Sequence, residues 1–80
     1  MKLRLTGKKV IISNTDTQSL AGSYSKVQVL YAAEASDYNE GDFVLVASEN
    51  HKNFPAFSYN GVDGKFVLNS DLGIVCKIEE

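Results

Sequence analysis

The residues best suited to acid–base or nucleophilic chemistry are the only histidine and the only cysteine of the chain, His51 and Cys76. A histidine titrates near neutral pH, and a cysteine becomes a nucleophile when a nearby positive charge or helix terminus lowers its pKa. His51 lies in the polar run 48–53, where we expect a solvated loop. Cys76 lies in an apolar run beside one positive charge, Lys77, so we expect a buried and inert thiol. The sequence therefore predicts a protein that is not an enzyme, with no catalytic residue.

Acidic residues around Gly41 form the best candidate for a metal site. Asp37, Glu40 and Asp42 lack the ligand spacing of a calcium loop, and turn chemistry accounts for them. One cysteine and one histidine are too few for a structural zinc site. Residues 61–65 lack the frame and the hydroxyl group of a phosphate-binding loop, so a hairpin turn is the better interpretation. We expect no metal and no cofactor.

The charge balance restricts the partners. The 80 residues contain eight lysines and arginines against ten aspartates and glutamates, a net charge of −2. Basic residues do not interleave with the aromatic residues, so we expect no nucleic-acid partner. No apolar run approaches the roughly 20 residues of a membrane span, and the N-terminus has no apolar segment of the signal-peptide kind. We expect a cytoplasmic protein with no membrane partner.

The elements that would position these residues are short strands. β-Branched and aromatic runs alternate with Gly, Asn, Asp and Ser clusters, which predicts an all-β chain. Pro55 cannot donate a ladder hydrogen bond and therefore favours an edge or a strand start, and the dipeptides at 60–61 and 63–64 predict a hairpin reversal. The polar residues 14–25 predict an exposed loop. The expected strands cover residues 2–5, 10–12, 27–31, 43–46, 54–59, 65–68 and 74–78.

These strands fit a single small domain, residues 1–80, with a modest core of its own. About six or seven short strands favour a small closed or nearly closed β-barrel, because closure removes exposed sheet edges. We expect the run 10–12 to be buried on both faces and the run 43–46 to be the central strand. The single cysteine excludes an intrachain disulfide, so association with other subunits is the remaining way to supplement the core.

Three segments, taken in order, resemble the subunit of the GroES-type co-chaperonin family. Residues 1–13 are similar to its opening, a short apolar segment with Arg4 that leads to basic residues and a β-branched run. Residues 40–46 are similar to its Gly-Asp step and the strand that follows. Residues 64–75 resemble its ending, a strand, an Asp-Leu turn at 71–72 and a last strand. The resemblance covers both ends of the chain and the middle strand, roughly two-thirds of the chain.

The resemblance implies an irregular, GroES-like β-barrel whose first and last strands pair between neighbouring subunits of a sevenfold homo-oligomeric ring. It also implies a GroEL-type chaperonin as partner. The candidates for the subunit interface are Leu3, Leu5, Val75 and Ile78. The alternative is that these four residues belong to the core within one subunit.

The family contacts its chaperonin through a long loop between the first two main strands, which here corresponds to residues 14–25. This loop lacks the family's apolar tripeptide, so Leu20 and Tyr24 are the remaining apolar anchors. The family's roof hairpin is replaced by the short connection 33–40. The candidate chaperonin-contact residues are Ser19, Leu20, Ala21, Gly22 and Tyr24.

Three hypotheses follow for function. The first is a short, divergent co-chaperonin-like subunit that caps or binds a chaperonin and assists protein folding. The second is a structural protein of a virus particle, a capsid decoration or connector component that uses the same barrel for assembly, located in the host cytoplasm or the particle. The third is a small barrel that binds nucleic acid, which the charge balance disfavours.

Overall fold

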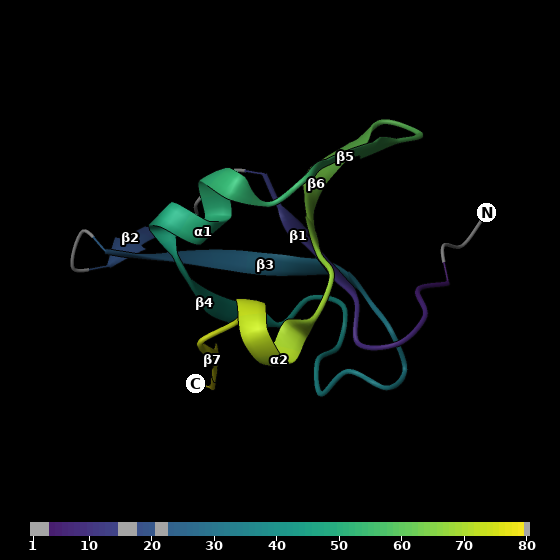
Figure 1. Ribbon diagram of the computed structural model, residues 1–80, viewed down its shortest axis with the longest axis horizontal. Helices are drawn as coiled ribbons and strands as arrows, with labels where there is room; N and C mark the ends of the chain where they lie inside the picture. Colours follow the sequence, from purple (N-terminus) through teal and green to yellow (C-terminus); the bar gives the residue numbers. More distant parts are fainter. Residues whose placement is uncertain (1–3, 15–17, 21–22, 80) are drawn as a thin grey trace.

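The computed structural model describes residues 4–14, 18–20 and 23–79, with the backbone alone for residues 18–20 (Figure 1). Seven strands and two short helices occur in this part of the chain. The strands are β1 (Val10–Ser13), β2 (Gln18–Leu20), β3 (Tyr24–Ala32), β4 (Phe43–Ala47), β5 (Ala56–Tyr59), β6 (Val62–Val67) and β7 (Cys76–Ile78). The helices are α1 (Ser48–Asn53) and α2 (Ser70–Gly73).

The strands form one antiparallel sheet, which confirms the predicted all-β class. Their hydrogen-bonded order is β5-β6-β1-β3-β4-β7, and β2 pairs with the start of β3. β3 is the longest strand and has β4 on one side, while β2 and β1 pair with its successive halves on the other side. β4 is an interior strand, but the middle of the order belongs to β1 and β3 rather than to the run 43–46.

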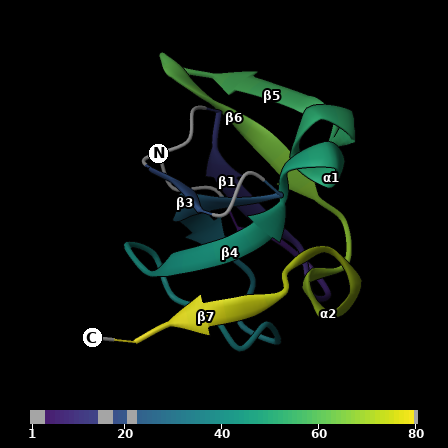
Figure 2. The same ribbon diagram turned by 90° about the vertical axis from the view of Figure 1, so that its left-hand side faces the viewer.

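The sheet is not the closed barrel that the number of strands predicts. Within the described residues, no pairing joins β5 to β7, which stand at the two ends of the strand order. The β5–β6 hairpin extends away from the body, whereas β7 lies against β4 on the other side of the molecule (Figure 1, Figure 2). β7 has three residues, and β4 is the strand with which it pairs. The sheet therefore keeps two open edges.

The core is built around β1. Val10, Ile11 and Ile12 are each 0% exposed, which confirms that this run is buried on both faces. Alternation along the strand directs Ile11 to the opposite face from its two neighbours, where Tyr31 and Phe66 occupy the paired positions. The main core cluster on the other face contains Val10, Ile12, Val27, Val29, Val44, Val46, Val67 and Ile74.

The reversal between β5 and β6 is the predicted hairpin. Asn60 and Gly61 have φ angles of 54° and 85°, the two positive values that a type I′ turn requires. Pro55 precedes β5, which lies at the end of the strand order, so its predicted edge position is confirmed. Gly64 belongs to β6 instead of the turn. A Cβ atom at this position would lie 2.5 Å from the carbonyl oxygen of Ile12, so β6 and β1 approach closely here.

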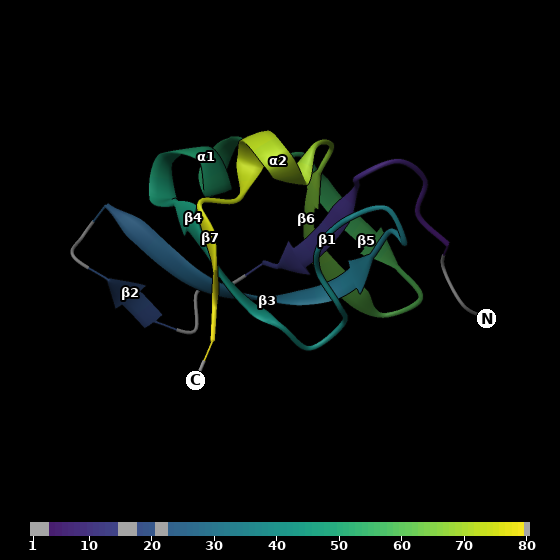
Figure 3. The same ribbon diagram turned by 90° about the horizontal axis from the view of Figure 1, so that it is seen from below.

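Neither helix is predicted from the sequence. The sequence predicts a loop where α1 forms and a turn at residues 71–72, within α2. The N-cap of α1 is Ala47, which makes no side-chain cap hydrogen bond, so this helix depends on tertiary contacts. In α2 the side chain of the N-cap Asn69 accepts a hydrogen bond from the Asp71 backbone at 3.0 Å. The two helices lie on the same face of the sheet (Figure 3).

We expect Gly64→Ala to lower the free energy of unfolding by about 1–3 kcal/mol, because the new methyl group has to displace the β1 backbone. Urea unfolding would measure the change. Gly61→Ala is the matched control, since Gly61 has a positive φ but open space around its missing side chain. Its cost should stay near 1 kcal/mol, the conformational penalty alone. Equal losses in the two variants would contradict the close approach at Gly64.

Candidate functional site

Three of the residues predicted to contact a chaperonin, Ser19, Leu20 and Tyr24, lie in paired strands and not in an open loop. β2 pairs with the start of β3, and we call residues 18–20 and 23–24 the arm. The molecule measures 36 × 24 × 22 Å, and the arm lies at one end of its long axis while the N-terminal segment leaves at the other (Figure 1). The predicted loop 14–25 is therefore wrong where it includes residues 18–20 and 24–25, which are strand residues.

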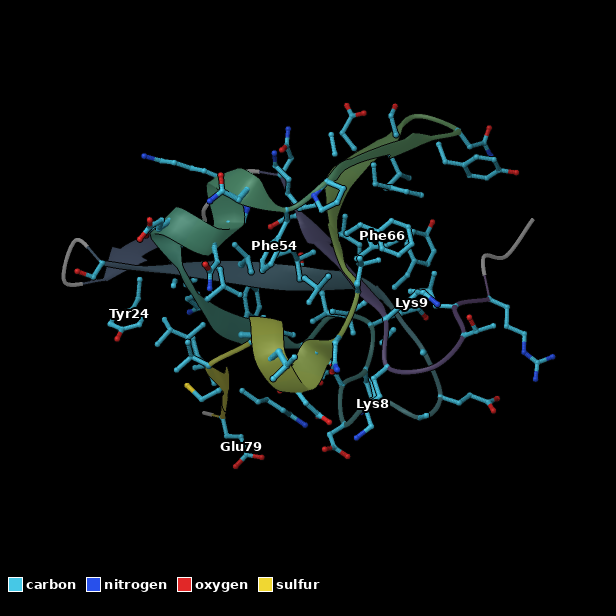
Figure 4. The ribbon with its side chains drawn as sticks, viewed as in Figure 1. Lys8, Lys9, Tyr24, Phe54, Phe66 and Glu79 are labelled. Carbon is cyan, nitrogen blue, oxygen red and sulfur yellow. The ribbon has the colours of Figure 1, made fainter. Side chains whose placement is uncertain are left out.

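The arm brings the two predicted apolar anchor positions together. Leu20 stands opposite Tyr24 in the β2–β3 register, and Ser19 stands opposite Ser25. Tyr24 is 40% exposed and lies at the arm end of the molecule (Figure 4). The other two predicted residues, Ala21 and Gly22, lie outside the described residues. The pairing of β2 with β3 therefore places the backbone positions of the two predicted anchors side by side, at one end of the molecule.

A hollow of about 480 Å³ separates the base of the arm from α1. Its lining residues are Ser23, Tyr24, Ala47, Ser48, Glu49 and Lys52. Glu49 and Lys52 give its rim one charge of each sign, while Tyr24 and Ala47 supply apolar surface. The arrangement suits contact with a partner segment that carries both apolar and polar groups.

His51 occupies an unexpected place in α1. It was predicted to be a solvated loop residue, but it lies in α1 and is only 8% exposed. Its Nε2 atom lies 3.1 Å from the backbone oxygen of Ser13, the last residue of β1. A helix of six residues is too short to show the apolar periodicity from which this burial could be predicted. The contact connects α1 to the point where the chain leaves the sheet toward the arm.

The open edge at β7 contains two of the predicted interface residues. Val75 is 56% exposed and Ile78 is half-buried. Cys76, expected to be buried, is exposed because β7 ends the strand order and nothing in the described part of the chain covers it. Leu72 of the adjacent α2 is also strongly exposed. Apolar side chains therefore collect beside an open strand edge.

The hydrogen bonds around β4 show which backbone groups of β7 face outward. On either side of β4, Asp42 accepts from Val29 of β3 and Ser48 donates to Ser23, which directly precedes β3. By alternation, the even-numbered residues of β4 direct their backbone groups to the β3 side. The carbonyl of Leu45 accepts from Val75, so the odd-numbered residues face β7. Lys77 stands opposite Val44 in the register. Its backbone N–H and C=O therefore point away from β4, toward the open edge.

The N-terminal segment carries the other predicted interface residues. Leu5 is half-buried, and Leu3 lies outside the described residues. The segment is attached to the body at Lys8, whose backbone oxygen accepts from Ser70 at 3.0 Å and whose ammonium group pairs with Asp71 at 2.5 Å. Lys8 lies beside α2 (Figure 4). In Figure 1 and Figure 3 residues 4–7 lead away from β7.

The short connection between β3 and β4 contributes a core residue near β7. Tyr38 packs against the main core cluster. Burial raises the pKa of its phenol above the ordinary 10.0, and the neighbouring negative charges, first Asp37 and then Asp71, add to the shift. Lys77 acts in the opposite direction. The connection therefore closes the core in addition to linking the two strands.

Within residues 4–14, 18–20 and 23–79, no three His, Cys, Asp or Glu side chains group as metal ligands would. Neither of the two helices found there has the length and apolar character needed to cross a membrane. Comparisons of the chain with protein-family models, with curated proteins and with solved structures find no match.

We expect stability to fall at alkaline pH, and Tyr38→Phe to weaken that fall. A phenol whose pKa is raised by folding holds its proton more tightly in the folded state, so its contribution is complete below about pH 10 and is lost as pH rises through the higher folded pKa. Urea unfolding midpoints at increasing pH would measure this.

Tyr38→Phe removes one of two alkaline contributions. Lys8 supplies the other, because its hydrogen bond and charge interaction with Asp71 raise the pKa of its ammonium group. In the variant the free energy of unfolding should therefore fall less steeply at alkaline pH, but it should still fall. An unaltered pH dependence in Tyr38→Phe would contradict the assignment.

Proposed function

We propose that this chain is the subunit of a ring-forming, co-chaperonin-like assembly that binds a chaperonin through its arm. The observation that carries the proposal is the position of β7 relative to residues 4–8 of the N-terminal segment. β7 leaves an outward-facing strand edge, and the N-terminal segment leads away from it on the same subunit. Residues 4–9 belong to no strand within the subunit, although a strand was expected over residues 2–5. The pairing of first and last strands that the GroES-type resemblance implies would therefore form on assembly, between neighbouring copies.

Such a pairing is heterologous, because a different surface of each copy takes part. Heterologous contacts close into a ring when the rotation between copies is suitable. Backbone pairing would cover the outward-facing groups of Lys77, and the exposed Val75 and Leu72 would be buried beside it. The contact would also remove an exposed sheet edge, which otherwise favours aggregation. Under this proposal Leu5, Val75 and Ile78 are interface residues.

The arm supports the second half of the proposal. Leu20 and Tyr24 occupy facing register positions at the end of the molecule opposite the N-terminal segment. A ring would place one arm per subunit on the same side. Several weak apolar contacts then act together, because each bound arm raises the effective concentration of the next. This compensates for the missing apolar tripeptide, since each arm retains at least two apolar positions.

We expect the wild-type chain to form a ring, sevenfold if the resemblance holds, and Lys77→Pro to abolish it. Proline removes the outward N–H of Lys77 without removing a donor to β4, so the subunit should stay folded. Native mass spectrometry would give the oligomeric state, and far-ultraviolet circular dichroism would report the fold.

Lys77→Ala is the matched control for this experiment. It also loses the ion pair between Lys77 and Asp42, 3.5 Å in length, but it keeps the backbone N–H. The ring should persist in Lys77→Ala and disappear in Lys77→Pro. A wild-type chain that stays monomeric at micromolar concentration would overturn the ring, and an intact Lys77→Pro ring would overturn the β7 edge as its interface.

We expect Tyr24→Asp and Leu20→Asp each to weaken chaperonin binding by about tenfold or more, because a charge replaces an apolar contact in every arm. Pull-down with a GroEL-type chaperonin, in the presence of nucleotide, would measure the binding. Tyr59→Asp is the matched control, since Tyr59 is 38% exposed against 40% for Tyr24 but lies on the β5–β6 hairpin. No binding by the wild type, or equal binding by all variants, would sink the proposal.

A further inference from the structure

We infer that α1 is a clamp that fixes the direction of the arm, with Ser48 and His51 as its positioning residues; the identity of what the arm binds rests on the proposed function. The chain enters the arm after Ser13, the last residue of β1, and returns from it at Ser25, the second residue of β3. We call these two residues the roots of the arm. α1 holds both roots.

The first contact is at the start of the helix. Ser48 follows β4 directly, and its backbone N–H donates to the carbonyl oxygen of Ser23 at 2.9 Å. Its hydroxyl oxygen lies 2.7 Å from that of Ser25, which is 1% exposed. These bonds hold the strand that returns from the arm. Because Ser25 is buried, water cannot readily take the place of the Ser48 hydroxyl.

The second contact is one helical turn further along. The imidazole of His51 reaches across to the backbone oxygen of Ser13 at 3.1 Å, so it holds the strand that enters the arm. The hydroxyl of Ser13 in turn accepts a hydrogen bond from the Gln28 backbone at 3.2 Å. Ser13 is therefore tied both to α1 and to β3 at the place where the chain leaves the sheet.

The helix depends on tertiary contacts, these among them, for its stability. It is six residues long and has no side-chain cap, whereas isolated helices of that length are unstable in water. β2 itself has three residues and pairs with β3 alone in the described part of the chain, so it cannot fix its own direction. Two roots held by one helix restrict the arm to one orientation, which lowers the entropy lost when it binds a partner.

Hydrogen–deuterium exchange of the free protein tests the clamp without any partner. We expect the amides of residues 18–26 to exchange about tenfold faster in His51→Leu, because the side chain keeps its bulk and loses its donor. His51→Gln places an amide N–H at a similar reach and should return exchange to within about threefold of the wild type. The amides of the β5–β6 hairpin are the internal control and should stay unchanged in both variants.

The outcomes separate the clamp from the proposed function. Unchanged arm exchange in His51→Leu, or equal acceleration in the β5–β6 hairpin, would overturn the clamp even if the wild type binds a chaperonin. Faster exchange confined to the arm and rescued by His51→Gln would support the clamp even if no chaperonin is bound. If the wild type does bind a chaperonin, the affinity should be lowest in His51→Leu, whose arm amides exchange fastest, and His51→Gln should bind nearly as tightly as the wild type. Should His51→Leu fail to fold, Ser48→Ala tests the same clamp from the other root, with the same pattern expected.

Discussion

The burial of β1 on both faces is the constraint on which the rest of the structure depends. Three consecutive side chains, Val10, Ile11 and Ile12, are removed from water, so each face of the sheet needs its own cover at this strand. One face receives the valine-rich core, and the other receives aromatic side chains, including Phe57 and Phe66 packed edge-to-face at 5.9 Å. β3 and β6 must flank β1 to supply these groups. The sheet order follows from that requirement.

The same constraint accounts for the open edges. Because β1 and β3 occupy the middle of the order, β5 and β7 are left at its ends, where each has a partner on one side only. Closing a barrel would require these two strands to meet, but the β5–β6 hairpin turns outward beyond Gly64, where the close approach to β1 holds β6 in place. A chain of this size has few large apolar residues, so when these gather at one central strand, fewer remain to cover the edge strands.

The features predicted from sequence were those set by local chemistry. The double burial of β1, the Asn60-Gly61 turn and the edge position of Pro55 each follow from residue type and spacing alone. The features missed depend on distant partners. α1 forms because His51 reaches a carbonyl 38 residues earlier, and Cys76 is exposed because no strand follows β7 in the order. The burial of Ser25 could have been predicted from sequence, because Ser25, Val27 and Val29 alternate along β3 and so lie on the same buried face.

β1 also connects the two regions on which the proposed function depends. Its first residue follows the N-terminal segment that would take part in the proposed subunit contact, and its last residue, Ser13, is held by α1 at the root of the arm. A strand buried on both faces between that contact and the arm would fix the angle between them. In a ring, identical angles would point every arm in the same direction, and the gain from multivalency depends on that alignment, because arms pointing apart cannot engage one partner together. The double burial of β1 thus fixes the geometry that a ring of short, weakly binding arms requires.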